Sequence, residues 1–145
     1  MNTNNIVYID GAYEALETEI DFPLTRLSDS GKLSDTVLEK INSELSFIKE
    51  NKIALPYIFA RKLISYSEEI GYGLLSSKLN IDTPLIAYFM GIIKPHQIFY
   101  DYSYQNGKPI ELTFSKNIKE KILSFVCALL GKEDYDDVGV KIDFD

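Results

Sequence analysis

The sequence predicts an α+β fold, in which a mainly helical single domain, residues 1–145, carries a small antiparallel sheet. Residues 34–50 and 115–130 repeat apolar side chains every three or four positions, which is the period of an amphipathic helix. Over residues 98–114 and 138–144 the apolar period is two instead, as it is in half-buried strands. With 145 residues, 46% of them hydrophobic and 26% charged, the chain has the size and composition of one globular domain.

The N-terminal third is predicted to begin with a strand and to continue as helix. Ile6–Ile9 is short and rich in β-branched residues, and Asp10-Gly11 follows it as a turn signal. A short acidic helix is expected from residue 12 to residue 20, with Glu14 and Glu17 facing outward. Pro23 should end this helix, because proline has no N–H to donate, and residues 24–33 should form a loop.

Three further helices are predicted before the middle of the chain. The helix over residues 34–50 has Leu38 on its apolar face, and Thr36 and Glu39 are arranged as in a capping box. Pro56 opens the next helix, which runs to about residue 70. Residues 74–79 are predicted to be a short helix after the break at Gly71-Tyr72-Gly73.

The ten residues Pro84–Ile93 contain no charge and are predicted to form a buried helix at the centre of the fold. Pro84 fits the first helical position, Asp82 and Thr83 are the candidate N-caps, and Lys94-Pro95 should close the helix. The run is too short to cross a bilayer, which needs about 20 apolar residues.

Alternating residues predict a hairpin over residues 98–114 and a C-terminal strand over residues 138–144 that could join it. A three-residue loop at residues 105–107 puts the apolar residues of both hairpin strands on one face, whereas a two-residue loop would mix the two faces. In that register Tyr102 pairs with Ile110. The helix over residues 115–130, which lies between these elements, should end at Gly131.

The net charge of −7 is concentrated at the two ends of the chain. Residues 1–21 carry five acids and no Lys or Arg, and residues 133–145 carry six acids and one Lys, whereas residues 22–132 have a net charge of +3. This distribution disfavours a nucleic-acid-binding face, which needs clustered cations. Acidic ends complement a basic partner, although they are also common as solvated segments that keep a protein soluble.

Residues for catalysis and for metal binding are scarce, so we expect no enzyme, no cofactor and no metal site. His96 is the single histidine and lacks a sequence-identifiable nucleophile partner, while Cys127 lies among apolar positions of a predicted helix. The segment from Asp134 to Asp145 partly matches a calcium-binding EF-hand loop, but Val138 occupies a ligand position and no helix follows. A small enzyme that uses carboxylates, with His96 as base, stays open as an alternative.

These observations favour a protein-binding inhibitor of a toxic enzyme, of the immunity or antitoxin type. Its partner is expected to be a basic toxin domain, such as a nuclease, and its acidic surface would cover the active site of that domain. The candidate partner-binding residues are four acids and two aromatic anchors: Asp134, Asp136, Asp137, Asp143, Tyr102 and Tyr104. A structural or oligomerisation subunit is a further alternative, and the oligomeric state is left open.

The N-terminal residues are polar and lack the basic region and apolar run of a signal peptide. The one cysteine excludes an intrachain disulfide and fits a reducing compartment. We therefore expect a cytoplasmic protein that has no membrane partner.

Overall fold

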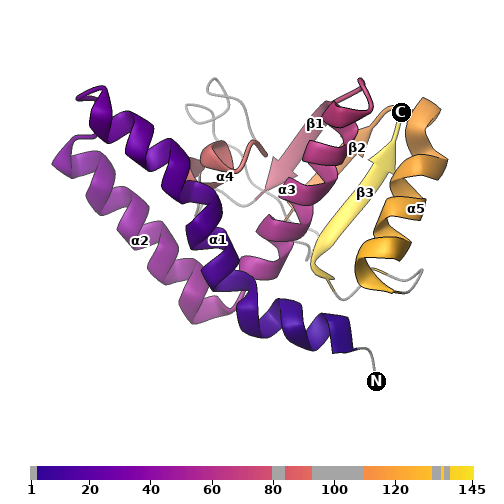
Figure 1. The fold of residues 1–145 in the computed structure, drawn as a ribbon, viewed down its shortest axis with the longest axis horizontal. Coiled ribbons are helices and arrows are strands. Elements are labelled where there is room, and N and C mark those ends of the chain that lie inside the picture. The colour runs from indigo at the N-terminus through magenta and orange to yellow at the C-terminus, as the bar shows by residue number, and fades with distance from the viewer. Residues whose placement is uncertain (1–2, 80–83, 93–109, 132–134, 136–137) are drawn as a thin grey trace.

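The computed structural model describes residues 3–79, 84–92, 110–131, 135 and 138–145. Helices dominate the first half, and the strands come from three separate parts of the chain (Figure 1). The elements in chain order are α1 (Thr3–Asp29), α2 (Asp35–Asn51), α3 (Ala54–Glu69), β1 (Leu74–Leu79), α4 (Pro84–Phe89), β2 (Ile110–Phe114), the 3-10 turn η2 (Lys116–Ile118), α5 (Lys119–Leu130) and β3 (Val140–Phe144).

The three strands form one mixed sheet in the order β1-β2-β3. β2 is central and pairs antiparallel with β1, so that Leu112 lies opposite Ser77, and parallel with β3, so that Leu112 also lies beside Ile142. The β1–β2 register shifts between Leu74 and Ser76, which leaves Leu75 without a partner in the ladder, as in a β-bulge.

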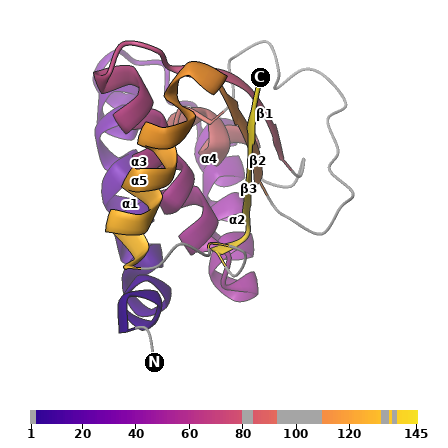
Figure 2. The same ribbon diagram turned by 90° about the vertical axis from the view of Figure 1, so that its right-hand side faces the viewer.

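The described helices lie to one side of this sheet, which is seen nearly edge-on in Figure 2. α3 contacts all three strands and also α5, so these two helices cover the inner face of the sheet. α1 packs on the outside of α3, and α2 packs on α4. The stacked rings of Tyr66 and Phe125, with centroids 4.4 Å apart and planes 6° from parallel, join α3 to α5.

One hydrophobic core connects the helices to the sheet. α3 is its centre, since ten of its residues are buried and it lies between α1 and the strands. In β2 the buried residues Ile110, Leu112 and Phe114 alternate with the half-buried Glu111 and Thr113. The inner face of the sheet is therefore apolar and its outer face is polar.

The predicted fold class is confirmed: the chain is α+β, mainly helical, with a small sheet. The helices predicted over residues 34–50 and 115–130 are α2 and η2 with α5, and Gly131 ends α5 in the left-handed conformation. The C-terminal strand is β3, which joins the sheet at the edge next to β2. The sequence led us to expect an antiparallel sheet, and this was wrong for one pair: β3 runs parallel to β2, because α5 crosses over between these two strands.

The prediction for the N-terminus was wrong, because α1 runs without interruption through the expected strand and turn and continues into the expected loop as far as Asp29. Four β-prone residues at Ile6–Ile9 are too few to establish a strand against a longer helical pattern. Pro23 lies inside α1 rather than ending it. Apolar residues on both sides of the proline, Ile20 and Leu24, pack against the core, and this burial outweighs the hydrogen bond lost at Pro23.

Two predictions about the strands were also wrong. Residues 74–79 form β1, not a helix, because pairing with β2 overrides a weak local preference. Ile110, Leu112 and Phe114 were expected to pair with a predicted strand at residues 98–104. Those residues lie outside the described part of the chain. The neighbours of β2 on its two sides are instead β1 and β3.

The helix ends differ from the predicted ones at two places. Ser34, not Thr36, caps α2, since its hydroxyl accepts a hydrogen bond from the N–H of Val37. Leu38, predicted to be buried, is 39% exposed.

α4 begins at Pro84 as expected but stops at Phe89. It stops there because Gly91, with φ +75°, forms a left-handed C-terminal motif in which the N–H of Ile92 donates to the carbonyl of Ala87.

Candidate functional site

Of the six residues predicted to bind a partner, the described part of the chain contains one. Asp143 lies on β3 and is half-exposed, and its carboxylate is 3.9 Å from the Nζ of Lys141. This neighbouring cation partly neutralises it. The other five predicted residues lie outside the described residues, as does His96: they are Tyr102, Tyr104, Asp134, Asp136 and Asp137.

A continuous acidic surface lies instead on α1. Glu14, Glu17 and Asp21 are exposed and follow one another at spacings of three and four residues, so they occupy one face of the helix. The opposite face carries the buried residues Leu16 and Ile20. We call Glu14, Glu17 and Asp21 the α1 acidic face.

Within the described residues, no Lys or Arg nitrogen lies within 4.0 Å of the three carboxylates of the α1 acidic face. Their negative field reaches Tyr13, whose pKa is raised by burial and then by the charges of Glu17 and Glu14. The side chain of Lys49, from α2, lies over the Tyr13 ring, with its Nζ 5.2 Å from the centroid. Among the described residues, the α1 acidic face therefore has no cation close enough to form an ion pair with it.

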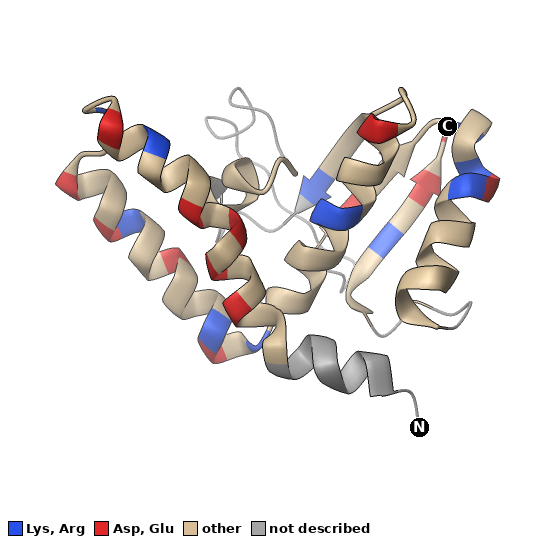
Figure 3. Cartoon of the chain, viewed as in Figure 1, with Lys and Arg blue, Asp and Glu red and all other residues tan. Residues whose placement is uncertain are grey.

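Acids outnumber bases on α1 and α2, whereas the elements on the other side of α3 carry charges of both signs (Figure 3). α1 contains six acids and one base, and α2 contains four acids and two bases. On the other side of α3, the segment from η2 through the first turn of α5 contains three lysines and one acid, Glu120. β3, which carries Asp143, lies on the other side of α3 from residues 11–29 of α1 (Figure 1). Asp143 is therefore not part of the α1 acidic face.

An exposed aromatic side chain borders the α1 acidic face. Phe22 is 67% exposed, and the guanidinium carbon of Arg26 lies 5.6 Å from its ring centroid. Beside it, Pro23, Tyr88 and Phe89 help to line a shallow groove of about 760 Å³ between α1 and α4. An exposed ring with a neighbouring groove and charged surroundings is typical of an anchor in a protein interface.

Phe22 is not among the partner-binding residues predicted from the sequence. The signal was available, since Phe22 is two positions from Ile20 and falls outside the stripe formed by Leu16 and Ile20. Because Pro23 was predicted to end the helix, Phe22 was assigned to the end of the helix and not to one of its exposed faces.

A second feature is a cleft between α3, β1 and the turn that follows α4. It has a volume of about 480 Å³, and Arg61 is the one cation among the described residues that line it. We call it the Arg61 cleft, and its lining residues are Arg61, Ile64, Glu68, Gly73, Leu74, Leu75, Ser76, Ser77, Gly91 and Ile92.

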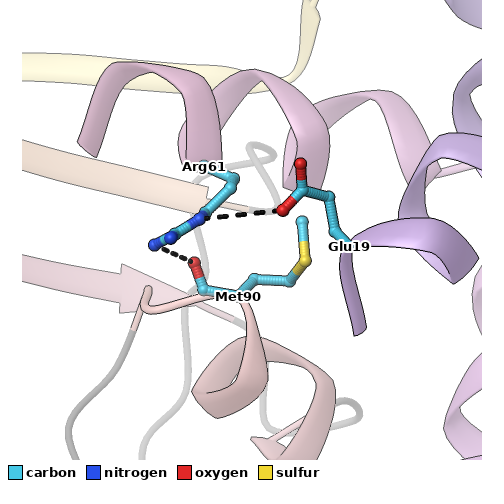
Figure 4. A network of polar contacts seen from close by, with 3 residues as sticks. All are labelled: Glu19, Arg61 and Met90. Carbon is cyan, nitrogen blue, oxygen red and sulfur yellow. Dashed lines mark hydrogen bonds and ion pairs between the residues drawn. The ribbon is translucent and has the colours of Figure 1, made fainter. Parts of the chain in front are cut away.

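The Arg61 guanidinium links three elements at one end of this cleft (Figure 4). Its Nε lies 4.0 Å from a carboxylate oxygen of Glu19 on α1, and its Nη1 donates to the carbonyl of Met90, 3.4 Å away. Both contacts are long for a charged group. The side chain is 35% exposed, so it is partly withdrawn from water without a close partner among the described residues.

Glu44 is the one carboxylate buried in the described core, with 2% of the residue exposed. It projects from α2 to the start of α4, where its two oxygens accept hydrogen bonds from the N–H groups of Ile86, at 2.8 Å, and Leu85, at 3.3 Å. Burial raises its pKa, and those two bonds and the charge of Lys40 partly offset the rise. Its place three residues after the buried Ile41, on the same face of α2, is the sequence signal for its burial.

Other kinds of site find less support in the described residues. They contain no group of three or more His, Cys, Asp or Glu side chains placed to hold a metal ion. Cys127 is free and half-buried in α5. Within the same residues, no helix has the length and apolar character needed to cross a membrane.

Comparison with known proteins does not assign the chain to a family. No family model, no curated protein and no solved structure matches it.

Proposed function

We propose that the chain is a cytoplasmic protein-binding inhibitor of a toxic enzyme, and that the α1 acidic face with Phe22 is part of its binding surface. The observation that carries this proposal is the exposed row of Glu14, Glu17 and Asp21 on one helix face, with no described cation within 4.0 Å of it. A row of this kind is most strongly complemented by a basic surface.

The proposed mechanism is occlusion guided by charge. Enzymes that cleave nucleic acids need a basic groove to hold phosphates, and an acidic helix laid along such a groove excludes the substrate. The carboxylates would raise the rate of encounter, and burial of the Phe22 ring would slow dissociation. The acidic residues Asp134, Asp136 and Asp137 and the anchors Tyr102 and Tyr104 stay in the proposal as a second contact region.

The experiment is an inhibition and binding assay against candidate basic toxin domains encoded beside the gene for this chain. The wild type is compared with a variant in which Glu14, Glu17 and Asp21 are all replaced by Lys. The expected result is inhibition by the wild type and loss of inhibition by the reversed variant at low salt.

A matched control separates a local effect from a change in total charge. Replacing Glu50, Glu69 and Glu120 with Lys changes the net charge by the same amount, but these exposed acids lie on α2, α3 and α5. The control variant should inhibit nearly as well as the wild type. Equal loss of inhibition in both variants would mean that only the net charge matters, and it would contradict a specific role for the α1 acidic face.

The second contact region needs its own variant. Reversal of Asp134, Asp136 and Asp137 to Lys tests the C-terminal acids alone, and Phe22→Ala tests the aromatic anchor. If inhibition survives Phe22→Ala and the α1 reversal but fails in the C-terminal variant, the partner binds through the C-terminal acids and the proposed α1 surface is wrong.

A further inference from the structure

The Arg61 cleft has the size and lining of a small-ligand site. Its volume of about 480 Å³ lies within the range of roughly 300–1,000 Å³ that is usual for such sites. Leu74 and Leu75 provide accessible apolar surface, since Leu74 is partly buried and Leu75 is 51% exposed, whereas Ile64 and Ile92 are almost fully buried. Arg61, Glu68 and Ser76 provide polar groups. An apolar pocket with a few polar groups that fix orientation is the usual form of a small-molecule site.

The Arg61 guanidinium has unused hydrogen-bonding capacity. It carries five N–H donors, and its contacts with Glu19 and Met90 involve two of its nitrogens. Both contacts are long, so a carboxylate that approached through the cleft could make shorter, charge-assisted bonds. Ser77, by contrast, already donates its hydroxyl proton to the carbonyl of Ile92, so it helps to hold the wall in place.

The backbone around the cleft departs from regular structure where the guanidinium comes close. A Cβ atom on Gly91 would lie 2.7 Å from the Nη1 of Arg61, so this position accommodates only glycine unless the arginine moves. On the opposite wall, Leu75 is skipped in the β1–β2 register and is half-exposed at the rim. Bulges are over-represented next to binding sites, where they reorient side chains.

The charges of the cleft select among anions. Glu68 lies two helical turns from Arg61 on the same face of α3, and Glu19 already contacts the guanidinium. One cation between two carboxylates disfavours a doubly charged anion such as phosphate. A single carboxylate attached to an apolar group satisfies Arg61 without placing extra charge near Glu68.

We propose that the Arg61 cleft binds a small aliphatic monocarboxylate, with the carboxylate on the guanidinium of Arg61 and the apolar chain along Leu74 and Leu75. This inference is independent of the α1 acidic face. It concerns other residues and another ligand, so either proposal can fail without the other.

The experiment follows backbone amide signals by NMR while the full-length chain is titrated with hexanoate. Hexanamide, which has the same shape without the charge, and inorganic phosphate are titrated in parallel. We expect hexanoate to give saturable shifts at the amides of Ser76, Ser77 and Gly91, and we expect hexanamide and phosphate to bind at least tenfold more weakly.

Two variants assign the effect to Arg61. Arg61→Gln should weaken hexanoate binding about tenfold or more, as expected for loss of hydrogen bonds to a charged group. Lys62→Gln removes the same charge from the adjacent exposed position and should bind as the wild type does. If Arg61→Gln does not fold, Arg61→Lys keeps the charge without the planar fork and should give intermediate affinity.

The proposal is overturned by any of three results. The first is an affinity of the wild type for hexanoate no higher than for hexanamide, the second is tighter binding of phosphate than of hexanoate, and the third is equal binding of hexanoate by Arg61→Gln and Lys62→Gln. The first two results come from the wild type alone, so they do not depend on how any variant folds.

Discussion

Glu44 joins α2 to α4 through two hydrogen bonds, and substitutions of this residue test how much those bonds stabilise the fold. Glu44→Ala removes the acceptor for the buried N–H of Ile86 and for the half-buried N–H of Leu85. An unsatisfied buried donor costs about 1–3 kcal/mol, and the space left by the side chain adds to this. We therefore expect the free energy of unfolding to fall by about 2–4 kcal/mol.

The change Glu44→Gln separates hydrogen bonding from charge. The amide oxygen of Gln can still accept from the N–H of Ile86 over the shorter of the two bonds. The expected loss at neutral pH is about 1 kcal/mol, less than that of Glu44→Ala. Glu39→Gln and Glu39→Ala, at an exposed position on the same helix, are the controls and should change stability by less than about 0.5 kcal/mol.

The pH dependence of this difference has a defined sign. Because burial raises the pKa of Glu44, the folded state holds its proton more tightly than the unfolded state does. The stability of the wild type relative to Glu44→Gln should therefore rise as pH falls from neutral through the raised pKa. It should level off below the unfolded value of about 4.3.

The assay is urea unfolding of the wild type and both Glu44 variants at a series of pH values from about 4 to 8. Control unfolding of the Glu39 variants corrects for titration elsewhere in the chain. Parallel stability curves for the wild type and Glu44→Gln, or a wild-type advantage that grows with rising pH, would refute the account of Glu44.

Three further predictions concern backbone geometry and packing. Lys52 ends α2 with φ +56°, so Lys52→Gly should raise the free energy of unfolding by about 0.5–1 kcal/mol, measured in urea. Gly91→Ala should lower the free energy of unfolding by about 1–2 kcal/mol, because φ is +75° and the new Cβ would meet the Arg61 guanidinium. An unchanged midpoint of urea unfolding would contradict that contact. A double-mutant cycle with Tyr66→Leu and Phe125→Leu should give a coupling energy of about 0.5–1.5 kcal/mol, and a value near zero would mean that the stacked rings contribute only their buried area.

The parts of the fold that could be predicted from the sequence are those that local patterning determines. In α2, α5 and β3 the apolar residues repeat at the period of the element, and a residue such as Gly131 marks an end. Each of these patterns needs no information about partners. Their order along the chain was enough to predict an α+β fold.

The parts that were wrong depend on contacts between distant residues. Residues 74–79 become β1 because they pair with β2, more than thirty positions away in the chain. α1 continues through Pro23 because Ile20, before the proline, and Leu24, after it, both pack against the core. Local propensity carries no information on either contact.

The candidate sites divide in the same way. The outward position of Glu14 and Glu17 could be predicted, because three- and four-residue spacings place them away from Leu16 and Ile20. The Arg61 cleft could not, since Arg61, Ser76 and Gly91 come from three elements that only the tertiary fold brings together.

The central claim, that the α1 acidic face guides a basic partner onto this chain, is tested most directly by the association rate as a function of ionic strength. The measurement compares the wild type, the variant with Glu14, Glu17 and Asp21 replaced by Lys, and the variant with Glu50, Glu69 and Glu120 replaced by Lys, all against the same basic toxin domain. We predict a steep fall in rate with added salt for the wild type and for the control variant, and a slow rate that rises with added salt for the α1 variant, because its lysines repel the basic partner until salt screens them. An association rate that shows the same salt dependence in the wild type and in the α1 variant would contradict the claim.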